Sequence, residues 1–139
     1  MRKIAAAGTL ALAFALAGCR ADSPEILVIG ERFFAQQVDD ILLNRAQYLG
    51  RTVRLEGIFR ALHWHETDMY HYYVVRYVTS CCGPHPIGFE LLPDSITPLP
   101  DMAWAEVTGV LEDDDGYIVI RVMSLVEMAE RGAELVDMQ

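Results

Sequence analysis

Lysine is almost absent from this chain. Lys3 is the one lysine among 139 residues, and arginine supplies every other basic side chain except the histidines. Acidic residues outnumber lysine and arginine by 20 to 11, which gives a formal net charge of −9 at pH 7. A surface of this sign repels phosphate backbones and anionic lipid headgroups. We therefore expect no nucleic acid among the partners of the folded domain.

Sequence motifs of common enzymes are absent as well. The chain has no phosphate-binding loop, no nucleophile elbow and no metalloprotease helix motif, so the sequence predicts a binding protein rather than an enzyme. The acidic residues 112–115 and Gly116 lack the alternating ligands and the distal glutamate of an EF-hand. We interpret this stretch as a solvated turn and not as a calcium loop.

The chain begins with an apolar run that is too short to cross a bilayer. Residues 4–17 are rich in alanine and leucine and follow Arg2 and Lys3. A spanning helix needs about 20 apolar residues, whereas Cys19 and polar residues follow this run at once. A positive start, a short apolar core and small residues before a cleavage point are typical of a secretory signal peptide.

The end of the run, Leu-Ala-Gly-Cys at residues 16–19, resembles the bacterial lipobox. The resemblance implies that residues 1–18 are removed, that Cys19 carries the lipid, palmitate included, and that residues 19–24 form a tether. Anchoring by more than one acyl chain is stable. We expect an extracytoplasmic, membrane-anchored lipoprotein on the outer membrane or on the outer face of the plasma membrane. Arg20, where a retention signal has aspartate, favours the outer membrane.

The remaining two cysteines are adjacent, at Cys81 and Cys82. An oxidising compartment favours disulfides. The Cα atoms of neighbouring residues are about 3.8 Å apart, however, below the roughly 4.4–6.8 Å of an ordinary disulfide. A bridge between these two residues would be strained and easily reduced. Two thiols in an exported domain therefore call for another explanation.

Hydrophobic periodicity predicts one helix followed by strands in a single domain over residues 25–139. Apolar residues recur at helical spacing over residues 32–47, and Gly50 provides a stop. After Gly50 the apolar residues alternate with a period of two, which is typical of strands. A short helix is expected after Ser124. The predicted strands are residues 53–61, 69–79, 87–92, 102–111 and 117–123.

Five short strands with a glycine bend at Gly57 predict a mainly β (α+β) fold. The architecture that fits best is a small five-stranded OB-like barrel preceded by one helix. A two-sheet sandwich is the alternative, because the sequence does not show how the edge strands close.

Histidine and cysteine gather in two predicted turns. Cys81, Cys82 and His85 share one turn, while His63 and His65 lie in the other, two residues apart. Thiolate and imidazole are the ligands that zinc and Cu(I) prefer. A strand of about ten residues would hold the two turns roughly 30 Å apart. We therefore predict a zinc site at Cys81, Cys82 and His85, to which His63 and His65 add only if that strand bends strongly.

Other interpretations stay open. Trp64, Tyr70 and Tyr72 are candidates for a ligand-binding face or for docking an envelope protein partner, although alternating tyrosines are also ordinary strand residues. A labile bridge between Cys81 and Cys82 would make the domain a thiol redox module. Alternatively, one thiol is a small core residue and the other lies on the surface.

Three segments of the chain resemble a known family. They are residues 48–60, with Tyr-Leu-Gly-Arg before a strand, residues 76–88, with the double cysteine before Pro-Ile-Gly, and residues 104–109, with Trp-Ala-Glu-Val-Thr-Gly. Together they are similar to the soluble C-terminal domain of the YcgQ-type permease-subunit family, over about residues 26–123.

This resemblance implies an extracytoplasmic β-barrel domain with a link to zinc supply, and it makes Cys81 and Cys82 hallmark positions. The chain departs from the family in two ways. A lipid anchor takes the place of the transmembrane part, and residues 83–85, Gly-Pro-His, stand where the family has alanine and aspartate.

Overall fold

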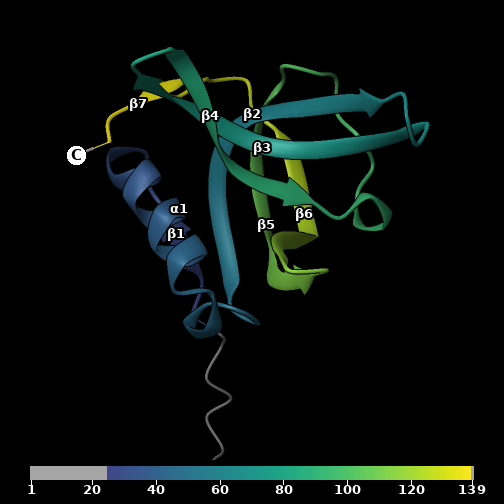
Figure 1. Cartoon of the computed structure of the whole chain (residues 1–139), viewed down its shortest axis with the longest axis horizontal. Helices are drawn as coiled ribbons and strands as arrows, with labels where there is room; N and C mark the ends of the chain where they lie inside the picture. The colour runs from purple at the N-terminus through teal and green to yellow at the C-terminus, as the bar shows by residue number, and fades with distance from the viewer. Residues whose placement is uncertain (1–24, 139) are drawn as a thin grey trace, which may run out of the picture.

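The computed structural model describes residues 25–138 (Figure 1). The predicted signal peptide, the predicted lipidation site Cys19 and the predicted tether to residue 24 lie outside this range. No helix within it is long and apolar enough to span a membrane. The elements are one α-helix and seven strands: β1 (Leu27–Ile29), α1 (Phe34–Leu43), β2 (Thr52–Trp64), β3 (Met69–Ser80), β4 (Gly83–Leu91), β5 (Trp104–Asp114), β6 (Tyr117–Glu127) and β7 (Leu135–Val136).

Five of these strands close into a barrel. Strand β2 pairs with both β3 and β5, β3 pairs with β4, β4 pairs with β6, and β6 pairs with β5, so that the ring has no open edge. All of these pairs are antiparallel except β4 with β6. This is the strand order of an OB-type barrel. The predicted fold class is confirmed, and the two-sheet sandwich is wrong.

Two short strands are added to the barrel. Strand β1 runs parallel to the start of β2, and β7 runs parallel to the end of β3. The expected helix after Ser124 is wrong, because β6 continues to Glu127 and β7 follows it. The helix before the barrel is present, but its α-helical part is shorter than residues 32–47, since 3-10 turns (Glu31–Phe33 and Arg45–Gln47) flank α1.

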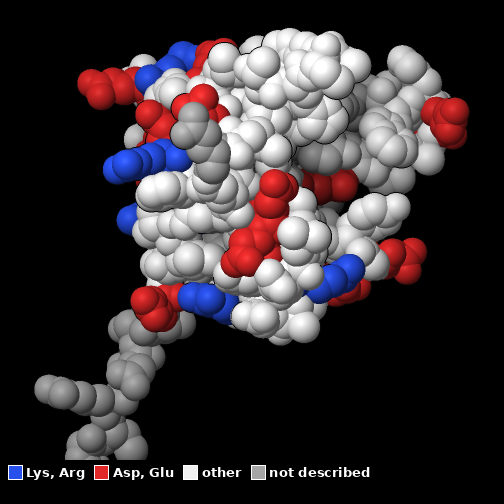
Figure 2. Space-filling model, turned by 60° about the vertical axis from the view of Figure 1, so that its left-hand side comes forward, with Lys and Arg blue, Asp and Glu red and all other residues white. Residues whose placement is uncertain are grey.

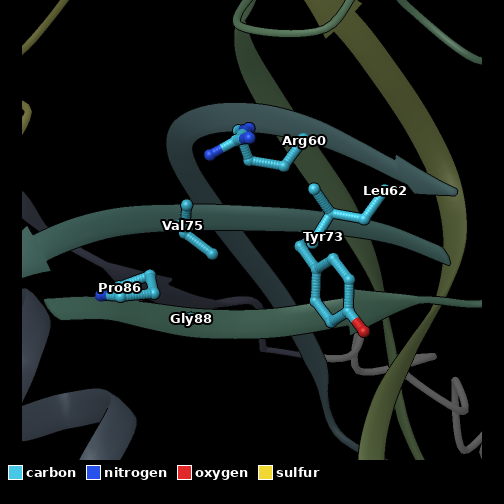
Figure 3. A pocket seen from close by; sticks show the side chains of 6 residues that line it. All are labelled: Arg60, Leu62, Tyr73, Val75, Pro86 and Gly88. Carbon is cyan, nitrogen blue, oxygen red and sulfur yellow. The ribbon is translucent and has the colours of Figure 1, made fainter. Parts of the chain in front are cut away.

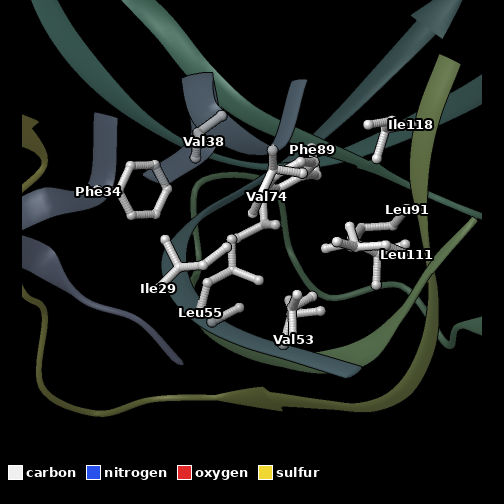
Figure 4. Packing of buried hydrophobic residues seen from close by; sticks show 14 of the residues in the cluster. Ile29, Phe34, Val38, Val53, Leu55, Val74, Phe89, Leu91, Leu111 and Ile118 are labelled. Carbon is white, nitrogen blue, oxygen red and sulfur yellow. The ribbon is translucent and has the colours of Figure 1, made fainter. Parts of the chain in front are cut away.

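The core fills the interior of the barrel and extends to the inner face of α1 (Figure 4). Helix α1 contributes fully buried Phe34 and Val38, which lie at helical spacing on its inner face. Alternate residues of β2, including Val53 and Leu55, point into the same core, because successive side chains of a strand lie on opposite faces. The helix therefore covers part of the barrel and buries its own apolar face.

A second packing centre holds the C-terminal segment against the barrel. Arg76 on β3 is only 2% exposed. Its guanidinium donates hydrogen bonds to the Glu31 carboxylate (3.0 Å), to the Glu56 carbonyl (2.9 Å) and to the Ala133 carbonyl (2.8 Å). A single buried arginine thus joins the segment before α1, strand β2 and the chain that leads into β7.

Several strands run further than the sequence pattern predicted. Strand β2 continues to Trp64, so the turn predicted to hold His63 and His65 is confined to residues 65–68. Strand β4 begins at Gly83, so the predicted turn 80–86 shrinks to Cys81 and Cys82. The two cysteines are therefore the tip of a tight β-hairpin.

Candidate functional site

The backbone of the β3–β4 turn is fixed by its two flanking residues. Ser80 and Gly83 face each other in the last register pair of the hairpin. The Ser80 hydroxyl donates a hydrogen bond to the Gly83 carbonyl at 2.7 Å. Gly83 has a φ of +109°, a backbone conformation that residues with a Cβ atom rarely adopt. Neither cysteine has a positive φ, so the glycine takes the strained position of the turn.

The turn brings the two thiols together. Both cysteines are exposed and unbridged, and their Sγ atoms lie 3.5 Å apart. On a straight strand, adjacent side chains would point to opposite faces. The bend between Ser80 and Gly83 therefore creates a surface dithiol, which we call the dithiol site (Cys81 and Cys82). Neither thiol is a buried core residue, so that structural interpretation of the cysteines is wrong.

His85 does not complete a larger cluster with these sulfurs. It lies on β4 opposite Val78, and it lines a surface hollow together with Leu42 of α1 and Ile87. Within residues 25–138, no group of three or more His, Cys, Asp or Glu side chains is arranged to hold a metal ion. The dithiol site thus offers two donors from this chain.

His63 and His65 lie at the other end of β3. The twelve residues of β3 separate the two turns, a span of roughly 36 Å at strand rise. The pairing of β3 with β2 and β4 has no register shift, and within residues 25–138 the histidines of one turn and the cysteines of the other are not brought together into a group that could hold an ion. His63 instead contacts Asp68, with Nε2 at 2.9 Å from Oδ1, and its ring meets that of His65 edge-on.

Where the pairing of β3 with β4 ends at Tyr72, β2 and β3 continue as a two-stranded arm, which we call the aromatic ribbon (residues 61–64 and 69–72). Ala61 and Tyr72 form its base and pack against the core. Figure 1 shows it projecting from the barrel. Tyr70 and Tyr72 stack at 6.2 Å on one face, and Trp64 packs on His71 at 4.5 Å. Trp64 pairs with Met69, which lies on the same face of the ribbon as His71, whereas Tyr70 and Tyr72 lie on the other face. The predicted aromatic set is therefore divided between the two faces of the ribbon.

A hollow that the sequence analysis missed lies on the outer surface of β2, β3 and β4 (Figure 3). Its volume is about 320 Å³, and its lining is mostly apolar: Arg60, Leu62, Tyr73, Val75, Pro86 and Gly88. The positive charge at its rim belongs to Arg60, and it is paired within the chain. The Arg60 guanidinium donates hydrogen bonds to the Asp101 carboxylate and to the Tyr77 hydroxyl, each at 3.0 Å. Burial, together with the nearby Glu90 carboxylate, raises the pKa of Tyr73.

Charged side chains are dispersed over the face of the molecule drawn in Figure 2. Acidic and basic groups alternate there with wide uncharged areas, and no continuous basic track is visible on this face of the described chain. This pattern agrees with the acidic balance of the sequence.

Comparisons with known proteins add little to these observations. No family model and no curated protein matches the chain. Among solved structures, it is similar to the second OB-fold domain of replication protein A from Methanococcus maripaludis, solved by solution NMR. The identity is 13%, the match covers 60% of this chain and 88% of that one, and the TM-score is 0.26. A likeness this slight carries no argument, and the OB-type assignment rests on the strand order.

Proposed function

We propose that this chain is a lipid-anchored extracytoplasmic binding domain that holds a thiophilic transition-metal ion, of the class of zinc or Cu(I), at the dithiol site. The observation that carries the proposal is the 3.5 Å distance between the exposed Sγ atoms of Cys81 and Cys82. Two Zn–S bonds of about 2.3 Å at a tetrahedral angle hold their sulfurs roughly 3.8 Å apart. Only a few tenths of an ångström separate the observed pair from that spacing.

The geometry favours metal binding over a redox bridge. To form a disulfide, the sulfurs must close from 3.5 Å to about 2.05 Å, between Cα atoms that are closer than in ordinary disulfides. A shared ion needs much less movement. The resemblance to the YcgQ-type family, with its double cysteine and its link to zinc supply, supports the same choice.

The placement of the turn suits an anchored binding domain. In Figure 1, the described chain begins at the end of the molecule opposite the β3–β4 turn. A tether that precedes residue 25 would then hold Cys81 and Cys82 away from the membrane surface. There the thiols are open to an ion, or to a protein that delivers or receives one.

Metal analysis of the protein tests this function. The full-length chain is expressed in a bacterial host, purified in mild detergent without chelator and analysed for bound transition metals, beside Cys81→Ser/Cys82→Ser. We expect about one ion per wild-type chain and none in the double variant. Thermal unfolding curves of the two proteins that coincide after the metal has been removed would show that the variant retains its fold. Equal metal content in both proteins would overturn the proposal.

A second candidate function is docking of an envelope protein through the aromatic ribbon. Leu62, Trp64, Met69 and Tyr70 are between 38% and 52% exposed there, and apolar side chains gathered on a projecting arm are typical of contact surfaces. A photo-crosslinker at position 64 in living cells should then give a discrete adduct. Position 123 on β6, where Met123 is 68% exposed, is the control. Identical products from both positions would rule this candidate out.

A further inference from the structure

We infer that the ion held at the dithiol site is Cu(I), bound by the two sulfurs of a single chain. This inference rests on the proposed function and goes beyond it by naming the ion, its oxidation state and its coordination. Three features of the turn support it: the number of donors, their chemical softness and their exposure.

The number of donors separates Cu(I) from zinc. Protein zinc sites have four ligands when structural, or three protein ligands and a water when catalytic. In the region from residue 25 to 138, the two sulfurs have no third His, Cys, Asp or Glu side chain placed to join them. Zinc would lack at least one protein ligand. Cu(I) binds two or three soft ligands, so the pair of sulfurs is sufficient for it. The 3.5 Å between the sulfurs suits a bent S–Cu–S angle, which leaves one side of the ion open.

The groups around the sulfurs do not alter this count. The Ser80 hydroxyl is engaged with the Gly83 carbonyl, and an oxygen donor is in any case a poor ligand for Cu(I). The imidazole of His85, the nearest histidine in the sequence, lines the hollow beside Leu42 and Ile87 instead. Thiolate sulfur is thus the donor type that the turn presents, and soft thiolates select soft ions.

Exposure of the turn agrees with the charge that results. On binding, the two thiols and one Cu⁺ form a bis-thiolate Cu(I) complex and release two protons. No oxidation state changes. The complex carries one negative charge. Because both cysteines are exposed, water solvates that charge, and no buried counter-ion is needed. An open side also remains where a sulfur donor of a delivering or receiving molecule can attach.

Parallel titrations under anaerobic, reducing conditions test the inference. Full-length protein in detergent is titrated with Cu(I) held by a chromophoric Cu(I) chelator, and separately with Zn(II) held by a weak zinc indicator. We expect one Cu(I) per chain to be withdrawn from the chelator, while zinc stays with its indicator. Cys81→Ser and Cys82→Ser should each lower the Cu(I) affinity at least tenfold, and His85→Ala should leave it unchanged.

Each other result has a defined meaning. Cysteine-dependent uptake of zinc from the weak indicator would overturn the assignment to Cu(I) and leave the proposed function standing. One Cu(I) for two chains, with a doubled mass in size-exclusion chromatography, would overturn single-chain binding. A tenfold loss in His85→Ala would overturn the two-sulfur coordination. Failure of the wild type to take up either ion, as in Cys81→Ser/Cys82→Ser, would overturn both the inference and the proposed function.

Discussion

The guanidinium carbon of Arg76 lies 4.8 Å from the centroid of the Trp104 ring, on the face of an indole that is itself 1% exposed. The same guanidinium carbon lies 5.1 Å from the centroid of the Phe34 ring. Cation–π contacts strengthen when desolvated, and Arg76 also makes charge-assisted hydrogen bonds to three separate segments. This arginine is therefore a structural residue that connects the barrel to the C-terminal segment.

Replacing Arg76 by methionine should lower the free energy of unfolding by about 2–4 kcal/mol, because cation–π contacts and hydrogen bonds to a charged group are lost together. Arg76→Lys keeps the charge but loses the planar fork, so it should recover only part of that loss. Denaturant unfolding of the purified chain measures both. Arg54→Met, on an exposed position of β2, is the control and should stay within about 0.5 kcal/mol of wild type.

The acid side of the stability curve depends on Glu31. The Ala133 N–H and the Arg76 guanidinium both donate to its carboxylate, and they hold the pKa of Glu31 below its ordinary value of 4.5. A carboxyl group with a lowered pKa stabilises the fold above its unfolded pKa and loses that contribution as the pH falls through the folded pKa.

Glu31→Gln should therefore reduce stability at neutral pH, and the difference from wild type should shrink below about pH 4.5, the ordinary pKa. Because half of this side chain faces solvent, we expect a difference of about 1 kcal/mol or less. Urea unfolding at a series of pH values measures it. A difference that grows as the pH falls would contradict this account.

Gly88 on β4 leaves no room for a side chain. A Cβ atom there would lie 2.0 Å from the Val74 carbonyl oxygen and 2.9 Å from the Val75 Cα, both of which belong to backbone. Gly88→Ala should thus force β3 and β4 apart and cost about 3 kcal/mol or more. Gly30→Ala is the matched control, since nothing lies within 4 Å of its Cβ position. Equal melting temperatures for the two variants would refute the close approach.

Asp101 holds the base of the aromatic ribbon. Its Oδ1 accepts hydrogen bonds from the Ala61 N–H at 2.9 Å and from Arg60 Nε at 3.0 Å. The hydrogen bond from the Ala61 N–H lowers the pKa of Asp101 most, and the hydrogen bond from Arg60 lowers it further. Asp101→Ala should speed amide exchange in residues 61–72 about tenfold, as the loss of roughly 1.4 kcal/mol of local stability implies. Exchange in the β5–β6 hairpin should not change, and an effect spread over both would indicate global unfolding instead.

Much of the barrel was predictable from the alternation of apolar residues. Val53, Leu55 and Phe59 fall on one face of β2 in the sequence pattern, and all three are buried in the core. The ends of the strands were less predictable. His63 and Trp64 border the polar residues 65–68 and were therefore predicted to lie in the turn. They stay in β2, because their backbones pair with Tyr70 and Met69 of β3.

The candidate site was predictable only in part. The adjacency of Cys81 and Cys82 is in the sequence, but their convergence depends on a two-residue turn that Gly83 permits with its positive φ. The direction of His85 is a tertiary property, since its place opposite Val78 sets it on the side of α1. The hollow beside Tyr73 combines residues of three strands, and no local pattern along the chain marks such a combination.

The measurement that bears most directly on the whole account is the transition-metal content of the full-length protein, isolated without chelator, beside Cys81→Ser/Cys82→Ser. A metal-binding dithiol site predicts about one thiophilic ion per wild-type chain and none in the variant, while the melting curves of the two metal-free proteins coincide. The same content in both proteins, or no ion in either even after reduction and reloading, would contradict it.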